Sequence, residues 1–212
     1  SDAIPKEVHF FNLRFHLGLD WYGGLYENSA EHHLVDGSPI YLCAAETLQR
    51  LAETVEEPLF VVSMRDPVAR VMSAWNHWTQ LSEEERWLIP NPEGSLLENL
   101  EAEWKWLDPR NPGDGFLGTG LYAAHLARAV EFFPRECFHF TFLEWLEDAY
   151  QSEIQRIFQF LHVPARSAPV LRAHSRERST GLFDEELLVR LQSFYREDRA
   201  CLSEILGFDP PW

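Results

Sequence analysis

Lysine is nearly absent from this chain of 212 residues, since only Lys6 and Lys105 occur among its 18 basic residues. The 34 acidic residues outnumber the basic ones and give a formal net charge of −16. Nucleic acids and anionic membranes are bound through basic faces, so we expect neither as the main partner. An anionic small ligand would need a local cluster of arginines, which suit bidentate recognition of phosphate or sulfate. Genomic base composition explains the arginine bias equally well.

Cysteines are few and long apolar runs are missing. Cys43, Cys137 and Cys201 are far apart and set among apolar neighbours, which indicates buried thiols rather than a disulfide framework or a zinc site. No His-Glu-x-x-His motif occurs, and we expect no metal. No run approaches the ~18 apolar residues of a membrane span, no signal peptide opens the chain, and no Asn-x-Ser/Thr acceptor is present. We therefore expect a cytoplasmic protein without a membrane span.

The remaining composition predicts one α/β domain spanning residues 1–212. About 45% apolar and 14% aromatic content suffices for a sizeable core. Strand and helix patterns alternate along the chain, as in folds built on a parallel sheet. Strand patterns lie at 7–13, 59–64 and 137–142, and at 37–42 a turn leads into a short extended piece. Helix patterns lie at 44–55, after Pro67, and at 95–107, 121–133, 149–161 and 184–195, with a Pro/Gly-rich loop at 108–120.

The stretch PLFVVSMRDPVARVMSAWNHW (58–78) combines a buried strand with a helix start. Residues 59–64 are apolar enough for a central strand covered on both faces, whose end lies at the rim where ligands bind in such sheets. Asp66 is a good N-cap and Pro67 a good first helical residue. Arg65 therefore lies beside unpaired helix N–H groups, which attract anions.

The helix after Pro67 adds a polar face. Val68, Val71, Met72 and Trp75 form its expected core stripe, whereas Arg70, Ser73 and His77 lie on another face. In one interpretation, Arg65 and Ser73 both reach the same phosphate. In the alternative interpretation, Arg65 pairs with a surface carboxylate and Ser73 only occupies the helix.

This segment resembles the 3′-phosphate-binding segment of sulfotransferases, in which a strand ends in Arg-Asp-Pro and a serine follows eight residues after the arginine. The resemblance implies that Arg65 and Ser73 bind the 3′-phosphate of the donor, 3′-phosphoadenosine 5′-phosphosulfate. It also implies the P-loop-nucleotide-hydrolase-like fold of this family, a three-layer sandwich with a central parallel sheet.

Other segments resemble the heparan sulfate 3-O-sulfotransferase type in the same order. KEVHFFN (6–12) is similar to the segment whose glutamate is the catalytic base and whose histidine supports it, which implies these roles for Glu7 and His9. In a strand, both side chains would emerge on one face. GSPIYL (37–42) resembles the Thr-Pro-x-Tyr loop on the acceptor side, which implies acceptor contacts for Ser38 and Pro39. A strand-end glutamate and a hydrogen-bonded histidine remain the alternative.

Further along, the resemblance is less specific. AHSRERSTG (173–181) occupies the place of the basic donor-binding loop, so Arg176 and Arg178 are expected at the donor phosphates, although an exposed solvated run is equally compatible. GLYAAHL (120–126) resembles a Gly-x-Tyr-x-x-x-Leu helix. Tyr122 and His77 are expected to face the acceptor or the adenine, the alternative being an aromatic residue in the core.

One motif has no counterpart in the chain. The family's Lys-x-Gly-Thr-Thr-like loop, which binds the 5′-phosphosulfate, would precede Ser1 by about a strand and a helix. We expect that the sequence lacks this N-terminal strand-loop-helix, the alternative being a degenerate relative.

The predicted function is sulfonate transfer to a hydroxyl or amine of a glycan or small metabolite, with unknown oligomeric state. Two alternatives are a non-catalytic relative that binds a nucleotide or a partner, and a phosphotransferase. The second would need a Walker lysine loop and a Mg²⁺-binding acid, and neither is visible.

Overall fold

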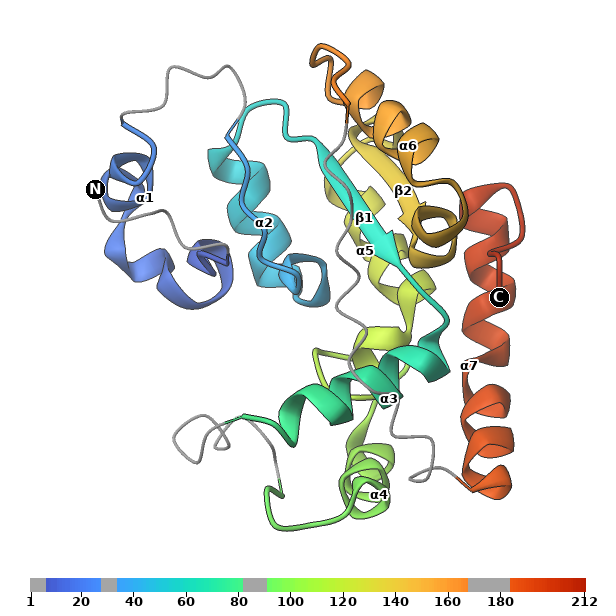
Figure 1. The fold of residues 1–212 in the computed structure, drawn as a ribbon. Coiled ribbons are helices and arrows are strands. Elements are labelled where there is room, and N and C mark those ends of the chain that lie inside the picture. Colours follow the sequence, from blue (N-terminus) through green and yellow to red (C-terminus); the bar gives the residue numbers. More distant parts are fainter. Residues whose placement is uncertain (1–6, 28–33, 82–90, 168–183) are drawn as a thin grey trace.

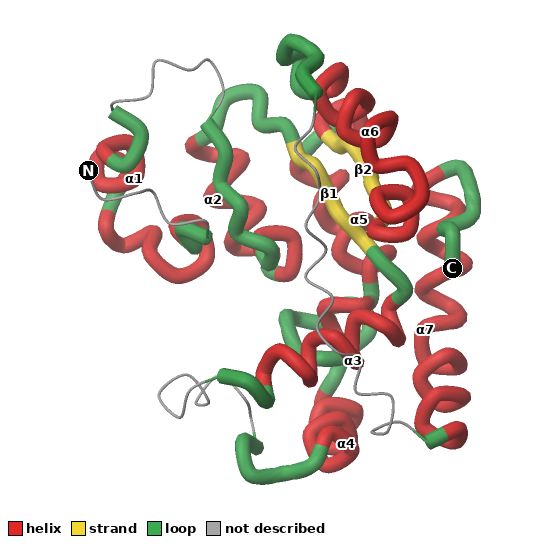
Figure 2. Tube along the Cα trace, in the orientation of Figure 1, coloured by secondary structure: helices red, strands yellow, loops and turns green. Residues whose placement is uncertain are grey.

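The computed structural model describes residues 7–27, 34–81, 91–167 and 184–212, which form a mostly helical α/β structure with a small parallel sheet (Figures 1 and 2). Both strands lie near the middle of the ribbon, and α7 runs along the side that carries the C-terminus. The helices are α1 (Leu19–Gly24), α2 (Ala45–Thr54), α3 (Pro67–Trp78), α4 (Leu96–Trp106), α5 (Tyr122–Phe132), α6 (Leu143–Phe160) and α7 (Glu185–Leu206). The strands are β1 (Phe60–Met64) and β2 (Phe138–Phe142).

The two strands pair in parallel, from Phe60 opposite Phe138 to Met64 opposite Phe142. Along β2 the side chains alternate between two helical layers, as the period of a strand requires. Phe138, Phe140 and Phe142 belong to a core cluster that also contains residues of α2, α5 and α7. His139 points to the other layer, where its ring lies 5.4 Å from the ring of Phe160 in α6. Helices therefore cover both faces of β2.

The expectation that β1 is buried on both faces is wrong for the described residues. Val61 is 40% exposed and Ser63 is also exposed, whereas Met64 is buried. The helix α6 lies mainly over β2 and contacts β1 less. An apolar run predicted the strand correctly but could not predict which neighbour covers it.

Helix starts follow the capping residues in the sequence. The Asp66 carboxylate accepts the N–H of Ala69 at 2.6 Å, and Pro67 is the first residue of α3. Ser95 and Glu98 form a reciprocal capping box at α4. These side chains satisfy N–H groups that would otherwise lack partners, which explains why the predicted starts of α3 and α4 are confirmed.

The strand predicted at 7–13 is wrong. Residues Phe10–Arg14 form a single π-helical turn, and His9 before it has a left-handed backbone with φ 52° and ψ 34°. The turn predicted within 37–42 is present, whereas the extended piece predicted after it is wrong, since a 3₁₀ turn follows at Tyr41–Cys43. Phe10 and Phe11 are both buried, so the burial pattern does not alternate as it does in a strand.

The prediction of three buried thiols is correct only for Cys43. Cys137 is partly exposed, and Cys201 is exposed on α7. Cys201 lies one position before the buried Leu202, on the helix face that turns away from the core. Apolar neighbours in sequence do not imply burial on a helix, because adjacent residues point in different directions.

The start of α5 is capped by a residue of α7. Its own flanking residue provides no side-chain cap. Instead, the Asp198 carboxylate accepts the N–H groups of Ala123 at 3.1 Å and Ala124 at 3.2 Å. Burial raises the pKa of Asp198 to about 6 from an ordinary value of 3.8. The carboxylate thus ties the two helices together across 74 residues of sequence.

This raised pKa predicts a pH dependence of stability. The folded protein binds the Asp198 proton more tightly than the unfolded chain, so this group's contribution is full below about pH 4 and is lost as the pH rises through about 6. We expect the free energy of unfolding to fall by about 2 kcal/mol over this window relative to Asp198→Asn, less than the full shift implies because solvent reaches part of the side chain. Urea titrations at several pH values measure the difference. Asp148→Asn, on the exposed side of α6, should keep the wild-type dependence.

Candidate active site

Glu7 and His9 meet at the turn that replaces the predicted strand. The Nε2 atom of His9 lies 3.5 Å from the Oε2 atom of Glu7, and these side chains are 21% and 42% exposed. The side-chain Nδ2 atom of Asn12 lies 3.4 Å from the Nδ1 atom of His9. Because His9 has a left-handed backbone, the pair does not have the i, i+2 geometry of a strand. The expected proximity of the two side chains is therefore present, with Glu7 open to solvent.

The loop at 36–41 holds this turn through side chains. The Ser38 hydroxyl accepts the N–H of His9 at 2.7 Å, and the Tyr41 hydroxyl accepts the N–H of Phe10 at 2.9 Å. Ser38 is buried, whereas Pro39 is exposed at the turn. Of the two residues predicted for the acceptor side, the structure thus brings Ser38 against His9 and leaves Pro39 at the surface.

Arginines hold the carbonyl groups of the same segment. Arg50 of α2 donates to the carbonyl oxygen of Phe11 at 2.8 Å, and Arg14 donates to the carbonyl oxygen of Val8. Arg50 also lies over the ring of Phe15, 4.8 Å from its centroid. Because both its N–H and its C=O groups are bound by side chains, this turn has a defined shape without belonging to a sheet.

Arg65 lies at the end of β1, immediately before α3. Its Nε atom is buried and has no hydrogen-bond partner among the described residues. The backbone around it is fixed, because Tyr122 donates its hydroxyl to the carbonyl oxygen of Arg65 at 3.1 Å and the N–H of Asp66 donates to Glu144 at 3.2 Å. Buried polar atoms are usually paired, so the unpaired Nε atom of Arg65 is unusual.

Ser73 and His77 lie further along α3, one turn apart, and both are exposed. Arg70, predicted on this polar face, instead donates to the carbonyl oxygen of Phe116. Arg176 and Arg178 lie outside the described residues.

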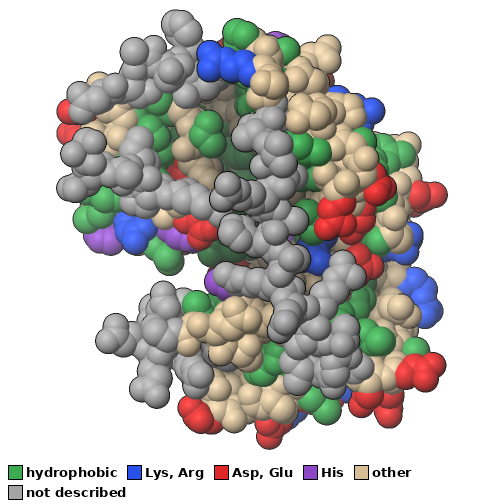
Figure 3. Space-filling model, in the orientation of Figure 1, with side chains coloured by type: hydrophobic (Ala, Val, Ile, Leu, Met, Phe, Trp, Pro, Cys, Tyr) green, Lys and Arg blue, Asp and Glu red, His purple; other side chains and the backbone are tan. Residues whose placement is uncertain are grey.

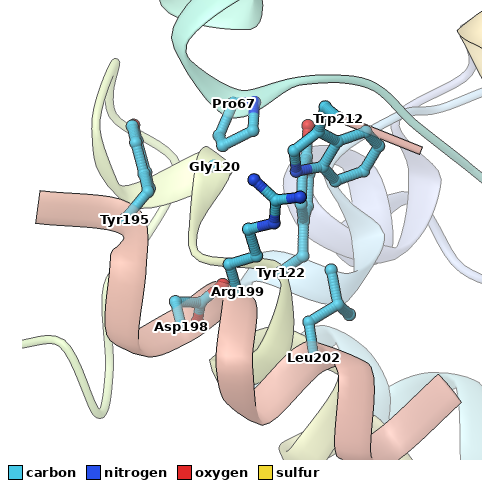
Figure 4. A pocket seen from close by; sticks show the side chains of 8 residues that line it. All are labelled: Pro67, Gly120, Tyr122, Tyr195, Asp198, Arg199, Leu202 and Trp212. Carbon is cyan, nitrogen blue, oxygen red and sulfur yellow. The ribbon is translucent and has the colours of Figure 1, made fainter. Parts of the chain in front are cut away.

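A small pocket lies beside the start of α3 (Figure 4). Its lining residues are Pro67, Gly120, Tyr122, Tyr195, Asp198, Arg199, Leu202 and Trp212. Tyr122 lines it from α5, and burial raises the pKa of its hydroxyl to about 12, so the group stays protonated and continues to donate to Arg65. Tyr122 therefore contacts the Arg65 segment. Arg199 reaches the same pocket from α7, and sequence patterns gave no signal for it.

The surface drawn in Figure 3 is hollowed between the part that carries α1 and α2 and the part that carries α3 and α4, with histidine and acidic side chains at the edge of the hollow. Within the described residues, no three histidine, cysteine or acidic side chains gather closely enough to hold a metal ion. No helix in that part of the chain is long and apolar enough to cross a membrane.

Comparison with known proteins identifies what these features belong to. Residues 14–179 match the model of the family described as "Sulfotransferase domain", a range that includes Arg65 and Ser73 and begins after Glu7 and His9. The mouse "Heparan sulfate glucosamine 3-O-sulfotransferase 3A1" is 25% identical over 99% of this chain and 57% of its own length. The human "Heparan sulfate glucosamine 3-O-sulfotransferase 6" is 25% identical over 99% of this chain and 66% of its own length. The chain thus spans less than two thirds of these relatives.

Two solved structures share the fold. A sulfotransferase from Alicyclobacillus acidocaldarius superposes with a TM-score of 0.72 at 23% identity, covering 97% of this chain and 85% of that one. The sulfotransferase domain from the curacin biosynthetic pathway superposes with a TM-score of 0.56 at 20% identity, covering 91% of this chain and 68% of that one. At these identities the two comparisons show the fold alone.

Proposed function

Because the chain belongs to the sulfotransferase domain family, we propose that it transfers a sulfonate group from 3′-phosphoadenosine 5′-phosphosulfate to a hydroxyl or amine acceptor. The observation that carries the proposal is the junction of β1 and α3 inside the matched range, where Arg65 precedes a capped helix N-terminus. We extend the proposal to the fold, as a P-loop-like three-layer sandwich whose central sheet includes β1 and β2. The single-domain organisation and the cytoplasmic location stay predictions.

The donor side of the proposed site consists of Arg65 and Ser73. A guanidinium can donate two parallel hydrogen bonds to a phosphate, and the N–H groups at the start of α3 add a favourable partial charge. Ser73 lies on the exposed face of the same helix and supplies a hydroxyl donor. Arg176 and Arg178 are proposed as further phosphate contacts.

The acceptor side consists of Glu7, with His9 beside it. As the acceptor oxygen attacks sulfur, its proton passes to the Glu7 carboxylate, and the bond between sulfur and the bridging oxygen of the 5′-phosphate breaks. The leaving group is 3′-phosphoadenosine 5′-phosphate, which keeps the bonding electrons. The Nε2 atom of His9 lies 3.5 Å from the Oε2 atom of Glu7, and His9 is proposed to support this carboxylate. Pro39 and His77 are proposed as acceptor contacts, and the buried Ser38 acts on the acceptor side through its hydrogen bond with the N–H of His9.

Donor recognition can be tested by calorimetry on the wild-type protein. We expect 3′-phosphoadenosine 5′-phosphate to bind at least about tenfold more tightly than adenosine 5′-phosphate, because only the first carries the phosphate assigned to Arg65 and Ser73. Equal affinities would contradict the donor assignment. Binding without any transfer to acceptors would instead favour a non-catalytic nucleotide-binding protein.

A further inference from the structure

One carboxylate on the acceptor side binds an unusual number of donors. The Oδ1 atom of Asp36 accepts the N–H of Ser38 at 3.0 Å and its hydroxyl at 2.5 Å. The Oδ2 atom accepts the hydroxyls of Tyr41 at 2.6 Å and Tyr22 at 3.1 Å. The four bonds use both oxygens of the carboxylate and connect α1, the 36–41 loop and the 3₁₀ turn that follows.

Two of these hydroxyls pass the interaction on to the backbone beside Glu7. Ser38 accepts the N–H of His9 at 2.7 Å, and Tyr41 accepts the N–H of Phe10 at 2.9 Å. Each hydroxyl has a single hydrogen, which it donates to Asp36, so its lone pairs face the amides. The donor-to-acceptor direction of both hydrogen-bond chains, from backbone amide through hydroxyl to Asp36, is thereby fixed. Consecutive hydrogen bonds of this kind polarise one another.

The amides of His9 and Phe10 lie on either side of the Cα atom of His9, and the backbone conformation of His9 is an unfavourable one. His9 has φ 52° and ψ 34°, a left-handed conformation that residues other than glycine adopt only when their surroundings enforce it. Its carbonyl oxygen accepts the N–H groups of Leu13 at 3.0 Å and Arg14 at 3.1 Å. The relays through Ser38 and Tyr41 hold the N–H groups of the peptide units before and after His9. This conformation places the His9 ring within 3.5 Å of Glu7.

Apolar packing alone does not explain the conformation. Phe10 and Phe11 are buried, and this burial anchors the turn in the core. It does not determine where the amide hydrogens of His9 and Phe10 point, whereas the two hydroxyls do. Burial, together with the Asp36 carboxylate, raises the pKa of Tyr22 and of Tyr41, so both tyrosines remain donors at neutral pH.

We propose that Asp36 is a positioning residue for the catalytic pair: through Ser38 and Tyr41 it fixes the left-handed turn at His9 that sets Glu7 and His9 against each other. The proposal rests on the proposed function of Glu7. Asp36 itself contacts neither the donor nor the reacting atoms. Its loss therefore changes turnover and leaves donor affinity unchanged.

The backbone part of the proposal is tested by hydrogen exchange, which needs no activity. In Asp36→Asn the amides of His9 and Phe10 should exchange at least about tenfold faster, while those of Leu48 and Leu51 in α2 stay within about twofold of wild type. A Ser38→Ala/Tyr41→Phe variant removes both relays without changing the charge. Adding Asp36→Asn to it should not accelerate the two amides further. Asp20→Asn, an exposed change in α1, is the matched control for charge.

The catalytic part is tested by turnover of the same proteins. We expect kcat to fall about 10–100-fold in Asp36→Asn, with the Kd for 3′-phosphoadenosine 5′-phosphate within about twofold, because a displaced base loses rate and not donor binding. If the amides of His9 and Phe10 exchange at the wild-type rate in Asp36→Asn, Asp36 does not hold them through Ser38 and Tyr41, and the proposed relay is wrong. If these amides exchange faster but kcat is unchanged, the relay exists but does not contribute to catalysis. A wild-type protein without transferase activity would refute the proposed function, and the exchange data would still decide the relay.

Discussion

Replacing Glu7 by glutamine is expected to lower kcat about 10²–10⁴-fold, the usual contribution of a positioned general base. Glutamine keeps the size of the side chain and can still accept a hydrogen bond, but it cannot take the acceptor proton at neutral pH. Donor affinity should change little, because Glu7 is assigned to the acceptor and not to the nucleotide. His9→Ala should cost less, since His9 supports the carboxylate without replacing it.

The measurement is steady-state turnover of the full-length protein with donor and a reactive acceptor. Glu131→Gln, the same change on the exposed side of α5, is the matched control and should keep wild-type turnover. Calorimetry with 3′-phosphoadenosine 5′-phosphate separates loss of catalysis from loss of binding. A Glu7→Gln enzyme with more than about a tenth of the wild-type kcat would rule out Glu7 as the base.

Replacing Arg65 by alanine is expected to weaken binding of 3′-phosphoadenosine 5′-phosphate by about 1.5–3 kcal/mol, the size of a charge-assisted hydrogen bond. The buried Nε atom of Arg65 has no hydrogen-bond partner in the described residues. Ser73→Ala should cost less, because a neutral hydroxyl makes the weaker bond. Adenosine 5′-phosphate lacks the 3′-phosphate and should bind equally to wild type and both variants.

Isothermal titration calorimetry with the two nucleotides provides this comparison. Arg110→Ala removes a positive charge from an exposed loop and controls for the general effect of charge. If Arg65→Ala weakens both nucleotides by the same amount, the side chain does not recognise the 3′-phosphate, and its assignment is wrong.

Elements with a strong period and a capping residue were predictable from the sequence. The α3 helix follows from Asp66 and Pro67, and α4 follows from Ser95 and Glu98, because these residues satisfy helix N–H groups locally. The apolar runs of β1 and β2 likewise predicted strands. Such signals depend only on neighbours in sequence, so the distant contacts formed on folding do not change the element that they predict.

The acceptor side was less predictable because its shape depends on residues that are distant in sequence. The 7–13 segment has strand-forming residues, yet its amides bind Ser38 and Tyr41, which lie 29 and 31 positions away from their partners. The positioning role of Asp36 was not predictable, because the local sequence Asp-Gly-Ser-Pro only indicates a turn. The left-handed backbone at His9 likewise has no local sequence signal.

The donor side was more predictable than the acceptor side, because its motif is local in sequence. The motif Arg65-Asp66-Pro67 was readable in sequence, and the structure adds what packs around it. Tyr122 was expected to face the acceptor or the adenine, and the structure brings its hydroxyl to the carbonyl oxygen of Arg65. Arg199 of α7 enters the adjoining pocket from far downstream in the sequence, which no local pattern could indicate.

The most direct test of the account is a single-turnover transfer experiment with full-length protein in excess over donor labelled in its sulfonate group. A panel of hydroxyl and amine acceptors, from small metabolites to glycans, is offered, and the labelled product and the nucleotide are separated. We predict that label appears on at least one acceptor in equal amount to the 3′-phosphoadenosine 5′-phosphate released, and that Glu7→Gln and Arg65→Ala both slow its appearance. Donor that binds tightly but remains intact with every acceptor would contradict the proposed sulfotransferase activity.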